Sequence, residues 1–142
     1  MKFDELINDS GSYLSFEQIV EPRTKEVRLR IIVNKAKNPT DLLIFPHADS
    51  KATTLQLDFP NYVTYSVIYD EFTRKDENEL YQGDAFRIYH KSELLDSIKQ
   101  KSILSDEKLK HFSLACIEHK VDILSYNEPI ISKVLDQNSL KE

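Results

Sequence analysis

The strongest constraint on this chain comes from two neighbouring segments in which side chains alternate in character residue by residue. In residues 54–59, Leu55, Leu57 and Phe59 alternate with Thr, Gln and Asp. Residues 62–69 follow the same period and are dense in β-branched and aromatic side chains. Successive side chains of a strand point to opposite faces, so this alternation predicts two strands. Pro60 ends the first of them, because proline cannot donate to a sheet ladder.

Further strands are predicted along the rest of the chain. Alternation predicts strands over residues 27–33, 85–90, 112–116 and 121–125, and a mostly apolar run predicts a short strand over 41–45. Residues 34–39 are predicted to form a turn, and residues 118–120 a hairpin turn or bulge. Residues 74–79 form a charged connector.

Helices are expected to be few and short. The first residues predict a short helix or turn, followed by a second helical or irregular stretch in which Ser15 and Gln18 form a capping-box pattern. A third helix is predicted near residues 92–101, with Ser92 as its N-cap. Its apolar positions form one amphipathic stripe: Leu94, Leu95 and Ile98.

This order of elements predicts an α+β fold. We expect a mainly antiparallel, curved sheet of six or more strands, with short N-terminal helices and the helix near residues 92–101. The helices should cover one face of that sheet. A chain of 142 residues has the usual size of one domain, so residues 1–142 are predicted to form a single α+β domain.

Composition narrows the functional classes. The formal net charge of −5 disfavours general binding to nucleic acid or to an anionic membrane. Only two glycines occur, Gly11 and Gly83, so neither a P-loop nor a dinucleotide-binding fingerprint can be written and no cofactor is predicted. The single cysteine and the acidic N-terminus, which does not resemble a signal peptide, predict a cytoplasmic protein.

No catalytic or metal centre is predicted. Cys116 and His119 form a Cys-x-x-His pair, but a closed zinc site usually shows two such pairs. Alternation places Cys116 on an apolar strand face, so a core cysteine is favoured over a nucleophile. The histidines are scattered, and His111 is expected near the start of a strand.

Two polar segments are candidate binding surfaces. The first is the acidic run Asp76, Glu77 and Glu79, which is either a solvated loop or a patch for a basic partner. The second is the face of the strand over 85–90 that carries Arg87 and Tyr89 and continues to Lys91.

Arg28 and Arg30 share the polar face of another predicted strand. If that strand lies beside the one carrying Arg87, the two form a basic-aromatic surface for a carboxylate or phosphate. The structural alternative, which we favour, is cross-strand pairing with acids such as Asp58 or Asp122.

Two stretches of the second half resemble segments of small bacterial proteins. These are Phe86 to Asp96, in which a strand with Arg and Tyr continues into a Lys-Ser turn and a Leu-Asp helix, and Phe112 to Pro129. Some such proteins act as immunity proteins, which neutralise a toxin by binding it. The resemblance implies a non-catalytic inhibitor.

Three functional hypotheses follow. The first is a protein-binding module of the immunity type whose partner is a basic toxin, with Asp76, Glu77, Glu79, Arg87, Tyr89, Lys91 and His111 as contact residues. The second is a small enzyme or ligand-binding domain with a site over the sheet, lined by Tyr65, Tyr69, Arg87, Tyr89 and His111. The third is a structural protein that associates with copies of itself through sheet edges.

Overall fold

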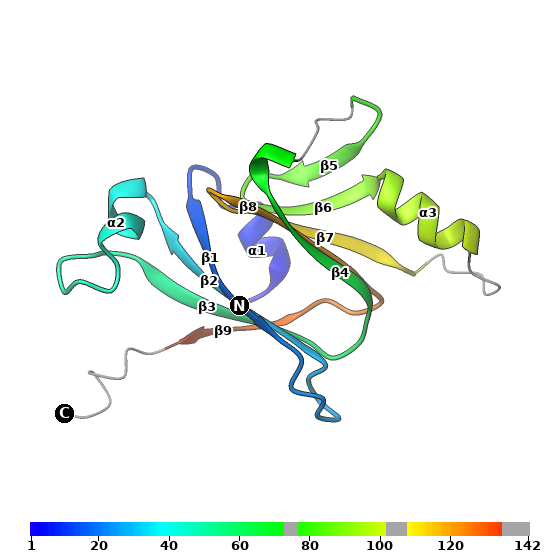
Figure 1. Cartoon of the computed structure of the whole chain (residues 1–142), viewed down its shortest axis with the longest axis horizontal. Coiled ribbons are helices and arrows are strands. Elements are labelled where there is room, and N and C mark those ends of the chain that lie inside the picture. The colour runs from blue at the N-terminus through cyan, green and yellow to red at the C-terminus, as the bar shows by residue number, and fades with distance from the viewer. Residues whose placement is uncertain (73–76, 102–107, 135–142) are drawn as a thin grey trace.

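The strands form two antiparallel sheets that face each other across one core (Figure 1). The computed structural model describes residues 1–72, 77–101 and 108–134. The first sheet has the spatial order β1 (Tyr13–Val20), β2 (Leu29–Ala36), β3 (Thr53–Phe59) and β9 (Ile130–Val134). The second has the order β4 (Tyr62–Tyr69), β8 (His119–Ser125), β7 (Lys110–Ala115), β6 (Phe86–Lys91) and β5 (Leu80–Gly83).

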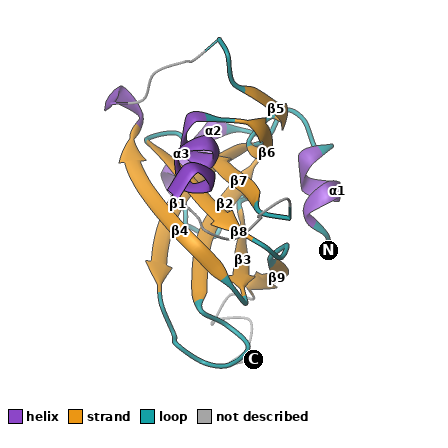
Figure 2. Ribbon diagram, turned by 90° about the vertical axis from the view of Figure 1, so that its right-hand side faces the viewer, coloured by secondary structure: helices purple, strands orange, loops and turns teal. Residues whose placement is uncertain are grey.

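The helices are short and lie on different sides of the sheets. α1 (Phe3–Ile7) packs against β5 and β6, on the side of the molecule away from β4 (Figure 2). α2 (Pro39–Ile44) packs against β1 and β2, and α3 (Glu93–Lys101) joins β6 to β7 at the opposite end of the molecule (Figure 1). A single 3-10 turn, η1 (Asp70–Phe72), follows β4.

Phenylalanine rings connect α1 to both sheets at the centre of the core. The Phe112 ring of β7 lies 5.0 Å from Phe3 of α1 and 5.7 Å from Phe59 of β3, in edge-to-face arrangements. All three side chains are fully buried. Because inner-face residues of both sheets belong to this one cluster, the sheets stabilise each other by burying apolar surface.

The α+β, mainly antiparallel class is therefore confirmed, and so are the strands predicted around residues 27–33, 54–59, 63–69, 85–90, 112–116 and 121–125. Two arrangements differ from expectation. The strands are divided between two sheets, where one curved sheet was expected. The helices do not share one face, because α2 and α3 pack on different sheets.

Three segments adopt a different structure from the one predicted. Residues 34–36, predicted to begin a turn, are the last residues of β2, because pairing with β1 overrides the local turn signal. The stretch with the Ser15–Gln18 capping pattern is strand β1. A bulge between Phe16 and Gln18 interrupts the alternation of its side chains, so the sequence pattern did not predict a strand there. Residues 41–45, predicted as a strand, lie mostly in α2. There Asn38 is the N-cap, accepting a bond of 2.9 Å from the Thr40 N–H, and Pro39 occupies the first turn.

The predicted helix near residues 92–101 is confirmed as α3. The Ser92 hydroxyl oxygen accepts a bond of 3.1 Å from the Leu95 N–H, as an N-cap does. Leu95 packs with Leu109 and Leu124 on the outer face of the second sheet. Strand β5 was not predicted, because it has only four residues and directly follows the charged connector. Residues 74–76 of that connector lie outside the described residues.

Candidate functional site

The predicted polar face of β6 exists, but it is not continuous with the arginines near β2. Arg87 and Tyr89 share one face of β6, whereas Phe86 is fully buried on the other. β2 and β6 belong to different sheets, so the joint basic-aromatic surface does not form. Arg30 instead pairs with Asp58 on β3, with Nε 2.8 Å from Oδ1. The structural alternative of cross-strand pairing is thus confirmed for Arg30.

Tyr89 and His111 are paired beneath the surface. They are cross-strand neighbours on β6 and β7, and their rings stack with centroids 4.4 Å apart. His111 has an exposed fraction of 2%. The Lys120 Nζ atom lies 5.0 Å from the centre of the Tyr89 ring, on the same face of the sheet. Only a small part of this pair is accessible to a partner.

His111 is at the centre of a buried chain of hydrogen bonds. Its Nε2 atom lies 2.8 Å from Asp122 Oδ1, and its Nδ1 atom lies 2.7 Å from Ser92 Oγ. A carboxylate only accepts, so Nε2 donates to Asp122, and in the neutral form of the ring Nδ1 accepts from the Ser92 hydroxyl. The Ser92 oxygen in turn accepts from the Leu95 N–H. Every donor and acceptor in this chain is satisfied when His111 is neutral.

Asp122 and Lys120 form an ion pair at the end of this series of hydrogen bonds. Burial alone raises the pKa of Asp122, but the hydrogen bond from His111 and the charge of Lys120 outweigh it and hold that pKa below its usual range. Burial likewise lowers the pKa of Lys120, yet the Asp122 charge raises it overall. The Lys120 Nζ atom lies 3.2 Å from both carboxylate oxygens.

Ser92, His111 and Asp122 are the three residue types of a hydrolase triad, but their geometry serves structure. Ser92 has an exposed fraction of 1%, and its oxygen already caps α3. A nucleophilic serine needs access to its substrate. The chain therefore fixes the start of α3 to β7 and β8. The only sequence signal for it was the Ser92 cap, because alternation gives the face on which His111 lies but not the strand beside it.

The predicted acidic run and the predicted β6 face meet beside β5. Asp76 lies outside the described residues, and Glu77 is exposed in the turn before β5. Glu79 and Lys91 line the same recess of about 310 Å³ at the start of α3, together with the carboxylates of Glu93 and Asp96. The Glu79 Oε2 atom accepts a bond of 3.0 Å from the Glu93 N–H.

Two exposed apolar side chains lie next to this recess. Leu80 and Tyr81 on β5 have exposed fractions of 60% and 45%. The guanidinium carbon of Arg87 lies 4.5 Å from the centre of the Tyr81 ring, a cation–π contact, and Arg87 Nε donates to the Asp84 carbonyl at 2.6 Å. We call Glu79, Leu80, Tyr81, Arg87 and Lys91 the β5 surface.

The side chains proposed for a site over the sheet have separate contacts. The Tyr65 hydroxyl donates to Glu21 at 3.2 Å, and the Tyr69 ring packs on His119 with centroids 4.6 Å apart. Both lie on β4, which β8 and β7 separate from β6. Arg87 contacts Tyr81 instead. The arrangement brings only Tyr89 and His111 of that group together.

The interpretation of Cys116 as a core residue is confirmed. Its thiol is buried, and burial raises its pKa to about 12. The Cys116 N–H donates to the His119 carbonyl at 2.9 Å, so this pair closes the turn between β7 and β8. Within the described residues, no group of three His, Cys, Asp or Glu side chains could hold a metal ion.

Comparison of the chain with family models, with curated proteins and with solved structures found no match. Among the described residues, no helix is long and apolar enough to cross a membrane. The β5 surface, which combines exposed apolar and charged side chains on an edge strand, is the candidate site.

Proposed function

We propose that this protein is a non-catalytic protein-binding module that inhibits a basic bacterial toxin in the cytoplasm, as an immunity protein does. The observation that supports this most directly is the pair of exposed apolar residues, Leu80 and Tyr81, on the last strand of the second sheet. Large exposed side chains surrounded by charge are typical of interfaces, because a partner gains free energy by covering them.

The centre of the β5 surface has the composition of a binding hot spot. Tyrosine and arginine are the residue types most enriched at such positions, because each offers a large contact area together with hydrogen-bonding groups. Here the contact with Tyr81 and the bond to the Asp84 carbonyl hold the Arg87 side chain in place. A pre-positioned arginine loses less conformational entropy when a partner binds.

The position of β5 adds backbone groups to this surface. β5 pairs with β6 on one side and is the outermost strand of its sheet. The other side of an edge strand presents unpaired N–H and C=O groups, which an extended segment of a partner can bind as an added strand.

Charge around the β5 surface favours a basic partner. Glu79, Glu93 and Asp96 outnumber Lys91 in the recess, and the whole chain carries a net charge of −5. Opposite charges accelerate the encounter of two proteins and fix their orientation. Toxins that attack nucleic acid are often basic, since their substrate is a polyanion.

The test compares two exposed leucines. Tagged wild-type protein, Leu80→Glu and Leu43→Glu are used to recover partners from cells that express the protein naturally. Leu43 on α2 is also exposed, at 81%, and lies far from β5 (Figure 1). We expect one basic partner to bind the wild type and Leu43→Glu, and Leu80→Glu to weaken its binding roughly 30-fold, the effect of losing a hot-spot contact.

A second measurement separates inhibition from other binding. The recovered partner, expressed alone, should arrest growth, and co-expression of the wild type but not of Leu80→Glu should restore it. A partner that binds both leucine variants equally would exclude the β5 surface as its binding site. A partner that is harmless alone would exclude the immunity function.

A further inference from the structure

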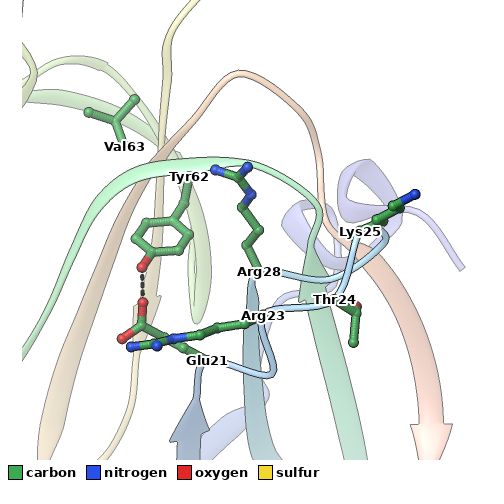
Figure 3. Close-up of a pocket in the computed structure, with 7 residues that line it drawn as sticks. All are labelled: Glu21, Arg23, Thr24, Lys25, Arg28, Tyr62 and Val63. Atoms are coloured by element: carbon green, nitrogen blue, oxygen red, sulfur yellow. Dashed lines mark hydrogen bonds between the residues drawn. The ribbon is translucent and has the colours of Figure 1, made fainter.

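The loop between β1 and β2 forms one wall of a basic cavity that is open to solvent, at the end of the two sheets opposite α2. The cavity has a volume of about 650 Å³, within the range of roughly 300–1,000 Å³ that small-molecule sites occupy. Its lining includes Arg23, Lys25 and Arg28 from the loop and Tyr62 from the start of β4. Figure 3 shows Arg28 extending beside the Tyr62 ring and Arg23 extending below it, next to Glu21 in this view, whereas Lys25 extends away from the ring.

Local hydrogen bonds hold the loop in this shape. The Thr24 hydroxyl donates to the Val27 carbonyl at 3.1 Å and accepts from the Val27 N–H at 2.9 Å. The Arg28 N–H donates to the Phe59 carbonyl at 3.0 Å, which ties the end of the loop to β3. Arg23 has a φ of 60°, a left-handed conformation that residues other than glycine rarely adopt. The backbone positions from which the two arginines extend are thus fixed by the loop itself.

The positive charges of the cavity have no counter-charge of their own. Within the described part of the chain, neither Arg23 nor Arg28 forms an ion pair or a side-chain hydrogen bond. The only carboxylate in the lining, Glu21, accepts hydrogen bonds from the hydroxyls of Tyr62 and Tyr65 (Figure 3). The lining therefore carries three cations and one carboxylate that is already engaged, and two of the cations, Arg23 and Arg28, extend near the Tyr62 ring.

We propose that this cavity binds a small phosphomonoester. Such a group carries a charge of about −1.5 to −2 at neutral pH, which matches the excess of two positive charges in the lining. Two guanidinium groups bind phosphate oxygens through paired N–H donors, and the Tyr62 ring provides a flat apolar wall for the organic part of the ligand. The phosphate would be bound by side-chain donors and not by the backbone N–H groups of a glycine-rich loop, which the sequence does not contain.

The probes are phenyl phosphate and benzoate, which share a phenyl ring but carry different charge. Amide resonances of the full chain are followed by NMR during titration with each. We expect phenyl phosphate to cause saturable shifts centred on residues 21–28 and 62–63, and benzoate to bind at least about tenfold more weakly, since a monoanion engages fewer of the cations. Equal binding of the two probes, or no saturable shift with phenyl phosphate, would overturn the proposal.

Matched variants assign the binding to the arginines. Arg23→Gln combined with Arg28→Gln should reduce phenyl phosphate affinity at least about tenfold. Lys51→Gln removes an exposed cation at the opposite end of β3 and should leave the affinity unchanged. Both arginines are exposed, so the double variant is expected to keep the wild-type spectrum outside the loop. Unchanged affinity in the double variant would also overturn the proposal.

This cavity and the β5 surface lie on different strands and are tested by different ligands. If Arg23→Gln/Arg28→Gln still binds the toxin, the β5 surface binds it without the cavity. If Leu80→Glu still binds phenyl phosphate, the cavity binds it without the β5 surface. Each proposal can therefore hold when the other fails.

Discussion

At the scale of single residues, the buried histidine is the most consequential polar group in the described chain. His111 satisfies Ser92 and Asp122 at once and stacks on Tyr89. A buried polar group that loses its partner costs more free energy than the hydrogen bond itself contributed, because water cannot replace the partner.

Replacing His111 should therefore destabilise the fold strongly. We expect His111→Ala to lower the free energy of unfolding by about 3 kcal/mol, because it removes two buried hydrogen bonds and a packed ring. His90→Ala is the matched control, since His90 is exposed on the neighbouring strand and contacts only Gln82, and its effect should stay within about 0.5 kcal/mol. Urea unfolding measures both. Similar changes in the two variants would mean that the buried hydrogen bonds of His111 contribute nothing to the free energy of unfolding.

Asp9 links the loop after α1 to the end of β2. Its carboxylate pairs with Lys35 and Lys37 and accepts a bond from Ser12. These contacts, chiefly the hydrogen bonds from the two lysines, lower its pKa to about 2 from 3.8. A depressed pKa means that the folded state binds a proton less readily than the unfolded chain, so the stabilisation is complete above about pH 4 and is lost as the pH falls towards 2.

Asp9→Asn should remove that acid-sensitive contribution. At pH 7 we expect a loss of about 1 kcal/mol, below the full value of the pKa shift because the side chain is partly exposed to water. Between about pH 4 and pH 2 the stability of the variant should fall less steeply than that of the wild type. Asp49→Asn, at a fully exposed loop position, serves as the control. Identical pH profiles for wild type and Asp9→Asn would contradict the assignment.

At the scale of elements, the turn between β5 and β6 depends on a glycine. Gly83 has a φ of 104°, and a Cβ atom there would lie 2.0 Å from the Phe86 carbonyl oxygen. Because that oxygen belongs to the backbone, the hairpin would have to open to relieve the clash. Gly11 also has a positive φ, of 79°, but a Cβ atom there meets nothing within 4 Å.

The two glycines provide a matched pair of variants. Gly11→Ala should cost about 1 kcal/mol, the price of a left-handed alanine. Gly83→Ala should cost at least about 3 kcal/mol, or detach β5, because strain and backbone clash add together. Urea unfolding gives the energies, and NMR shifts of residues 80–83 report whether β5 remains paired. Equal costs would show that the β5–β6 turn can relax freely.

At the scale of the whole molecule, the core between the sheets determines whether they unfold together. Phe112 of the second sheet contacts Phe59 of the first and Phe3 of α1. We expect Phe112→Ala to cost about 3–5 kcal/mol, because the cavity it leaves is surrounded by both sheets and α1. The amides of β2 and β7 should then show the same decrease in their exchange protection. A decrease confined to β7 would indicate that the sheets unfold separately and would contradict the predicted single domain.

The sequence predicted those strands whose own pattern carries the signal. Period-2 alternation is a local property, and it located β3, β4 and β8 before any contact was known. The α3 helix was predicted for the same reason, because an N-cap and an apolar stripe lie within ten residues. Where a bulge interrupts the alternation, as in β1, or a strand has only four residues, as in β5, the local signal fails.

Among the candidate residues, the sequence correctly favoured cross-strand pairing for Arg30, with Asp58 as one of two acids named, and placed Cys116 in the core. It did not predict that His111 lies between Ser92 and Asp122, nor that Arg28 lines a cavity with Arg23. Each of these contacts joins segments that are adjacent only after the chain has folded, or depends on how a loop turns.

The sequence by itself thus determined the class of this protein: strands, one amphipathic helix, a buried cysteine and polar β6 positions. The tertiary structure alone decided how the strands divide into two sheets, and with that which polar residues meet. The physical reason is that alternation specifies the face on which a side chain lies, but not the strand beside it. Strand order is set by burying apolar faces against each other, and that energy belongs to the whole chain.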